Sequence, residues 1–129
     1  MGISMTTAYW CVFIVVLLPY IWVLFARGPG FSLQKNRIPR IASESFEGVQ
    51  QRLYWAHLNS LEAIAPFAVA VIIAQSSYVE QQSIDMLALA FVGFRIAHAL
   101  AYIADIGLLR SLFFAAGMSC VVALFLSAA

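Results

Sequence analysis

Two groups of charged and hydrogen-bonding residues interrupt apolar stretches of this 129-residue chain. The first group consists of Arg52, Asn59 and Glu62, and the second of Arg95, His98, Tyr102 and Asp105. At about 100° per residue of an α-helix, each group falls within an arc of about 80°. Guanidinium, carboxylate, amide, imidazole and phenol groups on one helix face are suited to binding a polar, charged small molecule. Each stretch is therefore predicted to be a helix with one polar face.

A further cation opens the last apolar stretch. Arg110 is followed by Ser111, and the free backbone amides and dipole of a helix N-terminus favour an anion there. A thiolate or a carboxylate would be held well at this position. No second histidine or cysteine stands at metal-ligand spacing from His98, so no metal site is predicted. Tyr102 fits both ligand binding and anchoring at the membrane interface, and His57 is expected to be an interfacial residue.

The composition excludes a water-soluble fold. Hydrophobic residues make up 64% of the chain and charged residues 10%, whereas a soluble domain is about a quarter charged. A chain of this length cannot bury so much apolar surface, so the excess must face lipid. Four apolar stretches reach the roughly 20 residues that a membrane-spanning helix needs: about residues 5–26, 46–75, 82–104 and 108–128. We predict an all-α integral membrane protein with four transmembrane helices in one domain, residues 1–129.

Lysine and arginine are concentrated in two of the predicted connections. Arg27, Lys35, Arg37 and Arg40 lie in the first connection, and Arg110 follows the third. The second connection and both ends of the chain contain neither residue type. The positive-inside rule then places the basic connections in the cytosol and both termini on the other side. A bacterial inner membrane is the expected location, because the chain is minimal.

The depth of the polar groups decides how they can be accommodated. The second stretch starts and the third ends on the predicted cytoplasmic side, so antiparallel packing brings both polar faces to the same half of the bilayer. Arg95 lies about ten residues, roughly 15 Å, from the end of its helix, and Glu62 is expected at a similar depth as its partner. Because each lone charge there costs about 2.5–3.5 kcal/mol, two interpretations stay open. The residues form either an internal network that specifies helix packing or a site for a small molecule.

The first connection is predicted to be a surface loop that contains glycine, proline and basic residues. Its basic character fits attraction to anionic lipid headgroups. It equally fits a contribution to the capture of a ligand.

Paired motifs in the second and third stretches resemble those of a known family. The run WAHLNSLE at residues 55–62, followed by Pro66-Phe67, resembles the second-helix signature of the MAPEG proteins (membrane-associated proteins in eicosanoid and glutathione metabolism). The run RIAHALAY at residues 95–102 is similar to the third-helix signature, and Arg110-Ser111 falls where the family begins its fourth helix. The resemblance covers about residues 46–118.

The resemblance implies a left-handed four-helix bundle assembled as a homotrimer, with glutathione sites between neighbouring subunits at the cytoplasmic side. The residues that it assigns to glutathione are Asn59, Glu62, Arg95, His98 and Tyr102, with Arg27 as an extra contact. Arg110, helped by Ser111, would stabilise the glutathione thiolate. The implied activity is a glutathione-dependent transferase or peroxidase that acts on lipophilic electrophiles or lipid hydroperoxides arriving through the bilayer.

One position departs from the family pattern. Trp55 stands where active members commonly have an arginine that binds a glutathione carboxylate. Arg52, one turn earlier, would replace that contact in part. A second hypothesis is therefore a non-catalytic membrane subunit or scaffold of the same fold. A small multidrug-type transporter is disfavoured, because such proteins rely on a carboxylate in the first helix and this stretch has none.

Overall fold

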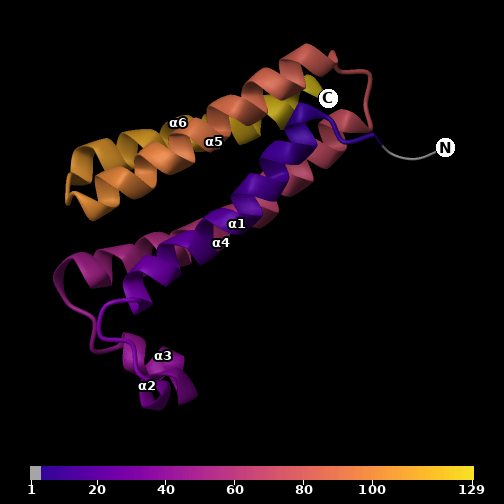
Figure 1. Cartoon of the computed structure of the whole chain (residues 1–129). Coiled ribbons are helices and arrows are strands. Elements are labelled where there is room, and N and C mark those ends of the chain that lie inside the picture. The colour runs from indigo at the N-terminus through magenta and orange to yellow at the C-terminus, as the bar shows by residue number, and fades with distance from the viewer. Residues whose placement is uncertain (1–3) are drawn as a thin grey trace.

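Four long helices form the body of the computed structural model, which describes residues 4–129 (Figure 1). They are α1 (Thr7–Arg27), α4 (Gly48–Gln75), α5 (Gln81–Ile103) and α6 (Gly107–Ser127). Each is long and apolar enough to cross a membrane, so the chain is a multi-pass membrane protein. The four predicted spans are confirmed to within two residues at every end.

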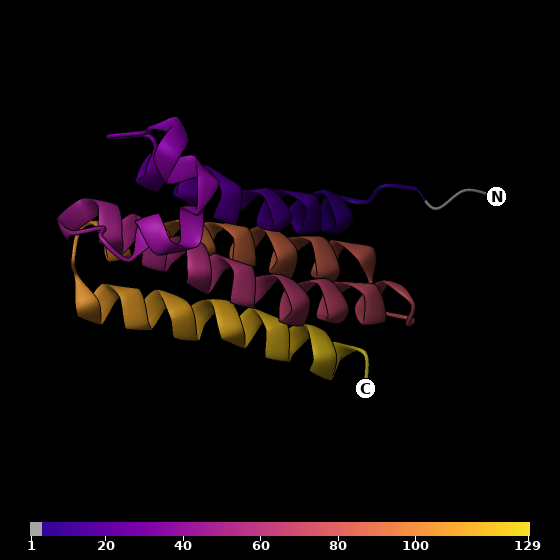
Figure 2. The same ribbon diagram turned by 90° about the horizontal axis from the view of Figure 1, so that it is seen from below.

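The helices pack in two neighbouring pairs. Helix α1 lies along α4 and α5 lies along α6, while α4 and α5 join the pairs (Figures 1 and 2). The start of α1 and the end of α6 lie at the same end of the bundle, as an even number of crossings requires (Figure 1). The first connection lies at the opposite end, so the polar halves of α4 and α5 are brought together near it.

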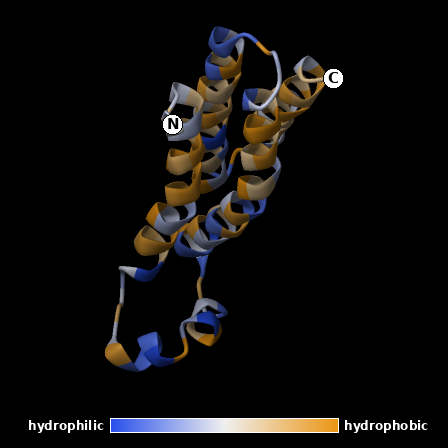
Figure 3. Cartoon of the chain, turned by 90° about the vertical axis from the view of Figure 1, so that its right-hand side faces the viewer, coloured by the Kyte–Doolittle hydropathy of each residue, from blue (hydrophilic) through white to orange (hydrophobic). Residues whose placement is uncertain are grey.

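The four long helices consist of hydrophobic residues over most of their length (Figure 3). Large side chains such as Leu24, Ile72, Leu89 and Leu126 are exposed. Hydrocarbon is the solvent that such a surface requires, and helices suit it because they satisfy every backbone amide internally. The hydrophilic residues are concentrated in the connections and at the ends of the helices, and some lie within the helices (Figure 3).

An aromatic stack surrounded by small residues forms the centre of the core. The rings of Phe67 and Phe91 are stacked with centroids 4.1 Å apart. Ala70, Ala74 and Ala88 are fully buried around them. Small side chains let membrane helices approach closely, and van der Waals packing then holds them together. This packing fixes how α4 and α5 are rotated toward each other.

The first connection differs from the predicted loop, because it contains two short helices, α2 (Leu33–Arg37) and α3 (Pro39–Ser43). The Ser32 side chain accepts a hydrogen bond from the backbone N–H of Lys35 at 3.1 Å, which caps α2. Pro39 begins α3, where its fixed φ suits the first helical position. Across the connection, the Gln50 amide at the start of α4 donates to the Ala26 carbonyl oxygen at 2.6 Å, which ties α4 to the end of α1.

The turn between α5 and α6 changes one prediction. Asp105 was expected to continue the polar face of the third span, but α5 ends at Ile103. Asp105 has φ +60°, and the Ile106 N–H donates to the Ala101 carbonyl at 2.9 Å. These features define a Schellman motif, in which a left-handed residue closes the helix. Asp105 is exposed and sets the angle at which α6 begins.

His57, which was predicted to be an interfacial residue, makes a contact that the sequence did not indicate. It is buried between α4 and α1. Its Nδ1 atom lies 2.7 Å from the Pro19 carbonyl oxygen. The imidazole therefore joins two helices by a hydrogen bond inside the bundle, which an apolar side chain could not do.

Candidate functional site

The two polar helix faces meet through Arg95 and Asn59. Arg95 is only 3% exposed, and its Nη2 atom donates to the Asn59 Oδ1 atom at 2.5 Å. The predicted direct pairing of Arg95 with Glu62 is wrong, because the hydrogen bond goes to the amide one turn earlier on α4. Glu62 is exposed at the outer edge of the same face, so its carboxylate stays free for another group.

An open cleft of about 260 Å³ lies between α4, α5 and the start of α6. It is lined by residues from all three helices: Asn59, His98, Tyr102, Arg110, Ser111 and Phe114. Five of these six are residues that the sequence singled out. The Schellman turn after α5 is what returns the first turns of α6, and with them Arg110, alongside Tyr102.

The polar groups of this cleft are only partly satisfied by the chain itself. The His98 Nδ1 atom is buried and has no hydrogen-bond partner among residues 4–129. The Arg110 guanidinium lies over the Tyr102 ring, 4.8 Å from its centroid. A cation held by a ring face keeps its N–H donors available. The cleft is thus positively charged and has free donors, so it is suited to an anionic ligand.

A second open cleft, of about 330 Å³, adjoins the first along α4. Its lining includes Trp55, Asn59, Glu62 and Tyr102, two of which also line the first cleft. The Trp55 side chain is 43% exposed, and its ring lies 6.3 Å from that of Tyr102. The carboxylate of Glu62 gives this part of the site an acceptor for a ligand ammonium group.

A third pocket, of about 110 Å³, extends the site toward the apolar core. Its apolar lining includes Pro66, Phe91, Phe114 and Met118. Arg95, Asn59 and Glu62 form its polar edge. Phe91, Phe114 and Met118 were not identified from the sequence, because little distinguishes them from lipid-facing side chains. The one available signal is that Phe114 and Met118 follow Arg110 at intervals of four residues on α6.

Two predicted site residues lie apart from the clefts. The Arg52 Nε atom donates to the Ile103 carbonyl oxygen at 3.0 Å, at the end of α5. Arg27 lines a separate pocket in the first connection, and its guanidinium lies 6.0 Å from the centre of the Tyr54 ring. Neither arginine lines the three cavities around Asn59 within one chain. A contribution of either one to the same site stays a prediction.

A four-span helical membrane protein with a basic, amide-lined cleft at one end of its bundle is the class that fold and site define. Residues 7–129 match the model of the MAPEG family, and the chain belongs to this family. No curated protein gives a significant match to the chain, and neither does any solved structure.

Proposed function

We propose that the protein is a glutathione-dependent transferase or peroxidase that acts on lipophilic electrophiles at the cytoplasmic side of the membrane. The observation that carries the proposal is the cleft in which Arg110, Ser111, His98 and Tyr102 converge on Asn59. Family membership supports the same activity, because the family contains membrane enzymes of glutathione and eicosanoid metabolism.

The residues present fit glutathione, a tripeptide with two carboxylates, one ammonium group and a thiol. The clefts of about 260 and 330 Å³ share two lining residues and together have the size of a small-molecule site. The exposed Glu62 carboxylate suits the ammonium group. The buried Arg95, which donates to Asn59, would hold the Asn59 amide in place for the ligand. The buried, unpartnered His98 Nδ1 atom is a polar group that a bound ligand would satisfy.

Arg110 has the central chemical role in this proposal. Bound glutathione supplies a thiolate that attacks an electrophilic carbon or a hydroperoxide. A free thiol has a pKa of about 8.5 and is mostly protonated at neutral pH, and an adjacent guanidinium lowers that pKa. Arg110 would hold the negative charge on sulfur, and the Ser111 hydroxyl would donate a hydrogen bond to it. The third pocket, lined by Phe91 and Phe114, would admit the apolar part of the second substrate.

A homotrimer is part of the proposal, because one chain leaves the site unfinished. Glu62 is exposed, and both larger clefts are open to the outside of the bundle. A carboxylate that faces hydrocarbon costs about 2.5–3.5 kcal/mol on insertion scales. A neighbouring copy that covers Asn59, Glu62 and Tyr102 would remove this cost and enclose the ligand.

Trp55 favours a second candidate, a non-catalytic membrane subunit or scaffold. Its side chain occupies the wall of the cleft beside Asn59 and Glu62, where an arginine is common in active members of the family. The nearest arginine on α4, Arg52, already donates to the α5 backbone. A scaffold of this kind would keep the Arg95–Asn59 hydrogen bond for packing and would not bind glutathione.

Glutathione binding by the detergent-purified full-length protein tests both candidates. Calorimetry would measure the affinity, and ultraviolet absorbance near neutral pH would report the bound thiolate. We expect binding with a thiolate signal that Arg110→Ala loses. Arg40→Ala, an exposed arginine outside the clefts, is the matched control and should keep the signal. A folded trimer that binds no glutathione would reject the enzyme and leave the scaffold.

A further inference from the structure

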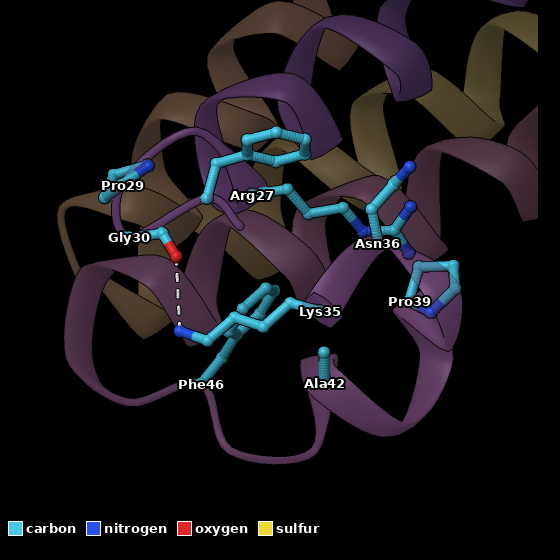
Figure 4. A pocket seen from close by; sticks show the side chains of 9 residues that line it. Arg27, Pro29, Gly30, Lys35, Asn36, Pro39, Ala42 and Phe46 are labelled. Carbon is cyan, nitrogen blue, oxygen red and sulfur yellow. Dashed lines mark hydrogen bonds between the residues drawn. The ribbon is translucent and has the colours of Figure 1, made fainter. Parts of the chain in front are cut away.

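A pocket in the first connection is separate from the clefts around Asn59 (Figure 4). It lies where the last turn of α1 meets α2 and α3, and its volume is about 50 Å³. The Arg27 side chain extends toward Asn36, and the Lys35 side chain reaches the Gly30 carbonyl oxygen (Figure 4). The pocket therefore brings two cations and one amide together from two helices.

The charges in this pocket are not balanced by the chain. The Arg27 Nε atom is buried and has no hydrogen-bond partner among residues 4–129. The Lys35 Nζ atom donates to the Gly30 carbonyl oxygen at 3.2 Å, which leaves two of its three donors free. Within residues 4–129, none of the side chains that line the pocket is acidic. An anion is the ligand that this arrangement favours.

The size of the pocket limits the anion to a small group. A single water molecule needs a cavity of about 10–15 Å³, so the pocket holds only a few waters. A phosphate group fits this space. A tripeptide such as glutathione does not, since small-molecule sites typically measure about 300–1,000 Å³.

Exposed apolar side chains lie next to the pocket on the membrane side. Leu24 and Phe25, in the turn of α1 that precedes Arg27, are 72% and 63% exposed. Phe31 and Leu33 are also exposed on the connection itself. This surface continues the lipid-facing side of α1 up to the cationic pocket, as a phospholipid with its acyl chains along α1 would require.

We propose that the pocket of Arg27, Lys35 and Asn36 binds the phosphate group of an anionic phospholipid in the adjacent leaflet. The bound lipid would join α1 to the first connection and hold α2 and α3 against the membrane surface. General attraction between basic residues and anionic headgroups is the simpler explanation. It predicts that the exposed Arg37 and Arg40, which do not line the pocket, contribute as much as Arg27 and Lys35.

Lipid binding by the full-length protein in detergent distinguishes these explanations. Native mass spectrometry would measure the binding of phosphatidylglycerol and of phosphatidylcholine with the same acyl chains. The double variant Arg27→Gln/Lys35→Gln removes the pocket charges, and Arg37→Gln/Arg40→Gln removes the same net charge outside the pocket. Circular dichroism would check that both variants fold, and the single variant Lys35→Gln replaces the first if it does not.

We expect phosphatidylglycerol to bind the wild-type protein more tightly than phosphatidylcholine. The pocket variant should bind it about tenfold more weakly than the control variant, which is the loss expected for a charge-assisted hydrogen bond. Equal losses in the two double variants would overturn the proposal in favour of general attraction. Displacement of the lipid by inorganic phosphate or by glutathione at equal concentration would also overturn it, because the pocket would then serve a soluble anion.

Discussion

Replacing Trp55 with arginine tests the proposed glutathione site most directly. The side chain is 43% exposed and lines the cleft that contains Asn59, Glu62 and Tyr102. Because Trp55 is outside the buried core, Trp55→Arg should leave the core packing intact. The new guanidinium would face the cleft and offer donors to a glutathione carboxylate.

The expected gain follows from the interaction that the substitution adds. A hydrogen bond to a charged group contributes about 1.5–3 kcal/mol, which corresponds to an affinity about 10- to 150-fold higher. The substitution also removes the aromatic contact with Tyr102, whose centroid distance is 6.3 Å. That contact is worth about 0.5–1.5 kcal/mol, and its loss lowers stability without lowering affinity for the ligand.

Isothermal titration of glutathione into the purified protein measures the effect. Val49→Arg is the matched control, since Val49 is exposed on the first turn of α4 and lies outside the clefts. We expect Trp55→Arg to bind at least tenfold more tightly than the control variant. Equal affinities for the two variants would show that no glutathione carboxylate lies beside residue 55.

Three further substitutions test how the fold positions the site, each measured by thermal unfolding in detergent. Asp105→Gly should stabilise the protein by about 0.5–1 kcal/mol. It relieves left-handed backbone strain of about 1–2 kcal/mol, and the larger conformational entropy of glycine in the unfolded chain offsets only part of this gain. A lower melting temperature would contradict the Schellman assignment. Asp85→Ala should destabilise the protein by about 1 kcal/mol, since the Asp85 carboxylate accepts a hydrogen bond from the Ala8 N–H in the first turn of α1 at 2.9 Å. An unchanged melting temperature would show that Asp85 does not stabilise the start of α1. Phe67→Ala should cost about 3–5 kcal/mol, whereas the lipid-facing Val69→Ala should cost little; similar costs would contradict the stacked core.

The sequence predicted the local structure of the long helices well. Runs of about 20 apolar residues must be helical in lipid, because no other single segment satisfies its own backbone there. The same reasoning did not resolve the first connection, where α2 and α3 depend on local features. A serine cap at Ser32 and a proline at Pro39 were visible in the sequence. Helices of five residues are too short to be stable from such local features alone, so they depend on the rest of the fold.

The candidate site, too, was predicted in part from the sequence and decided in part by the tertiary structure. Helical periodicity, together with the predicted antiparallel packing, indicated that Asn59, Arg95 and Tyr102 lie on facing surfaces. Membership of the MAPEG family is confirmed over residues 7–129. Tertiary structure decided which atoms meet, because the rotation of each helix and the reach of each side chain select among neighbours one turn apart. Arg95 therefore bonds Asn59 instead of Glu62, and Arg27 lines a pocket of its own. These choices depend on distances of a few ångströms between helices, which a one-dimensional pattern does not contain.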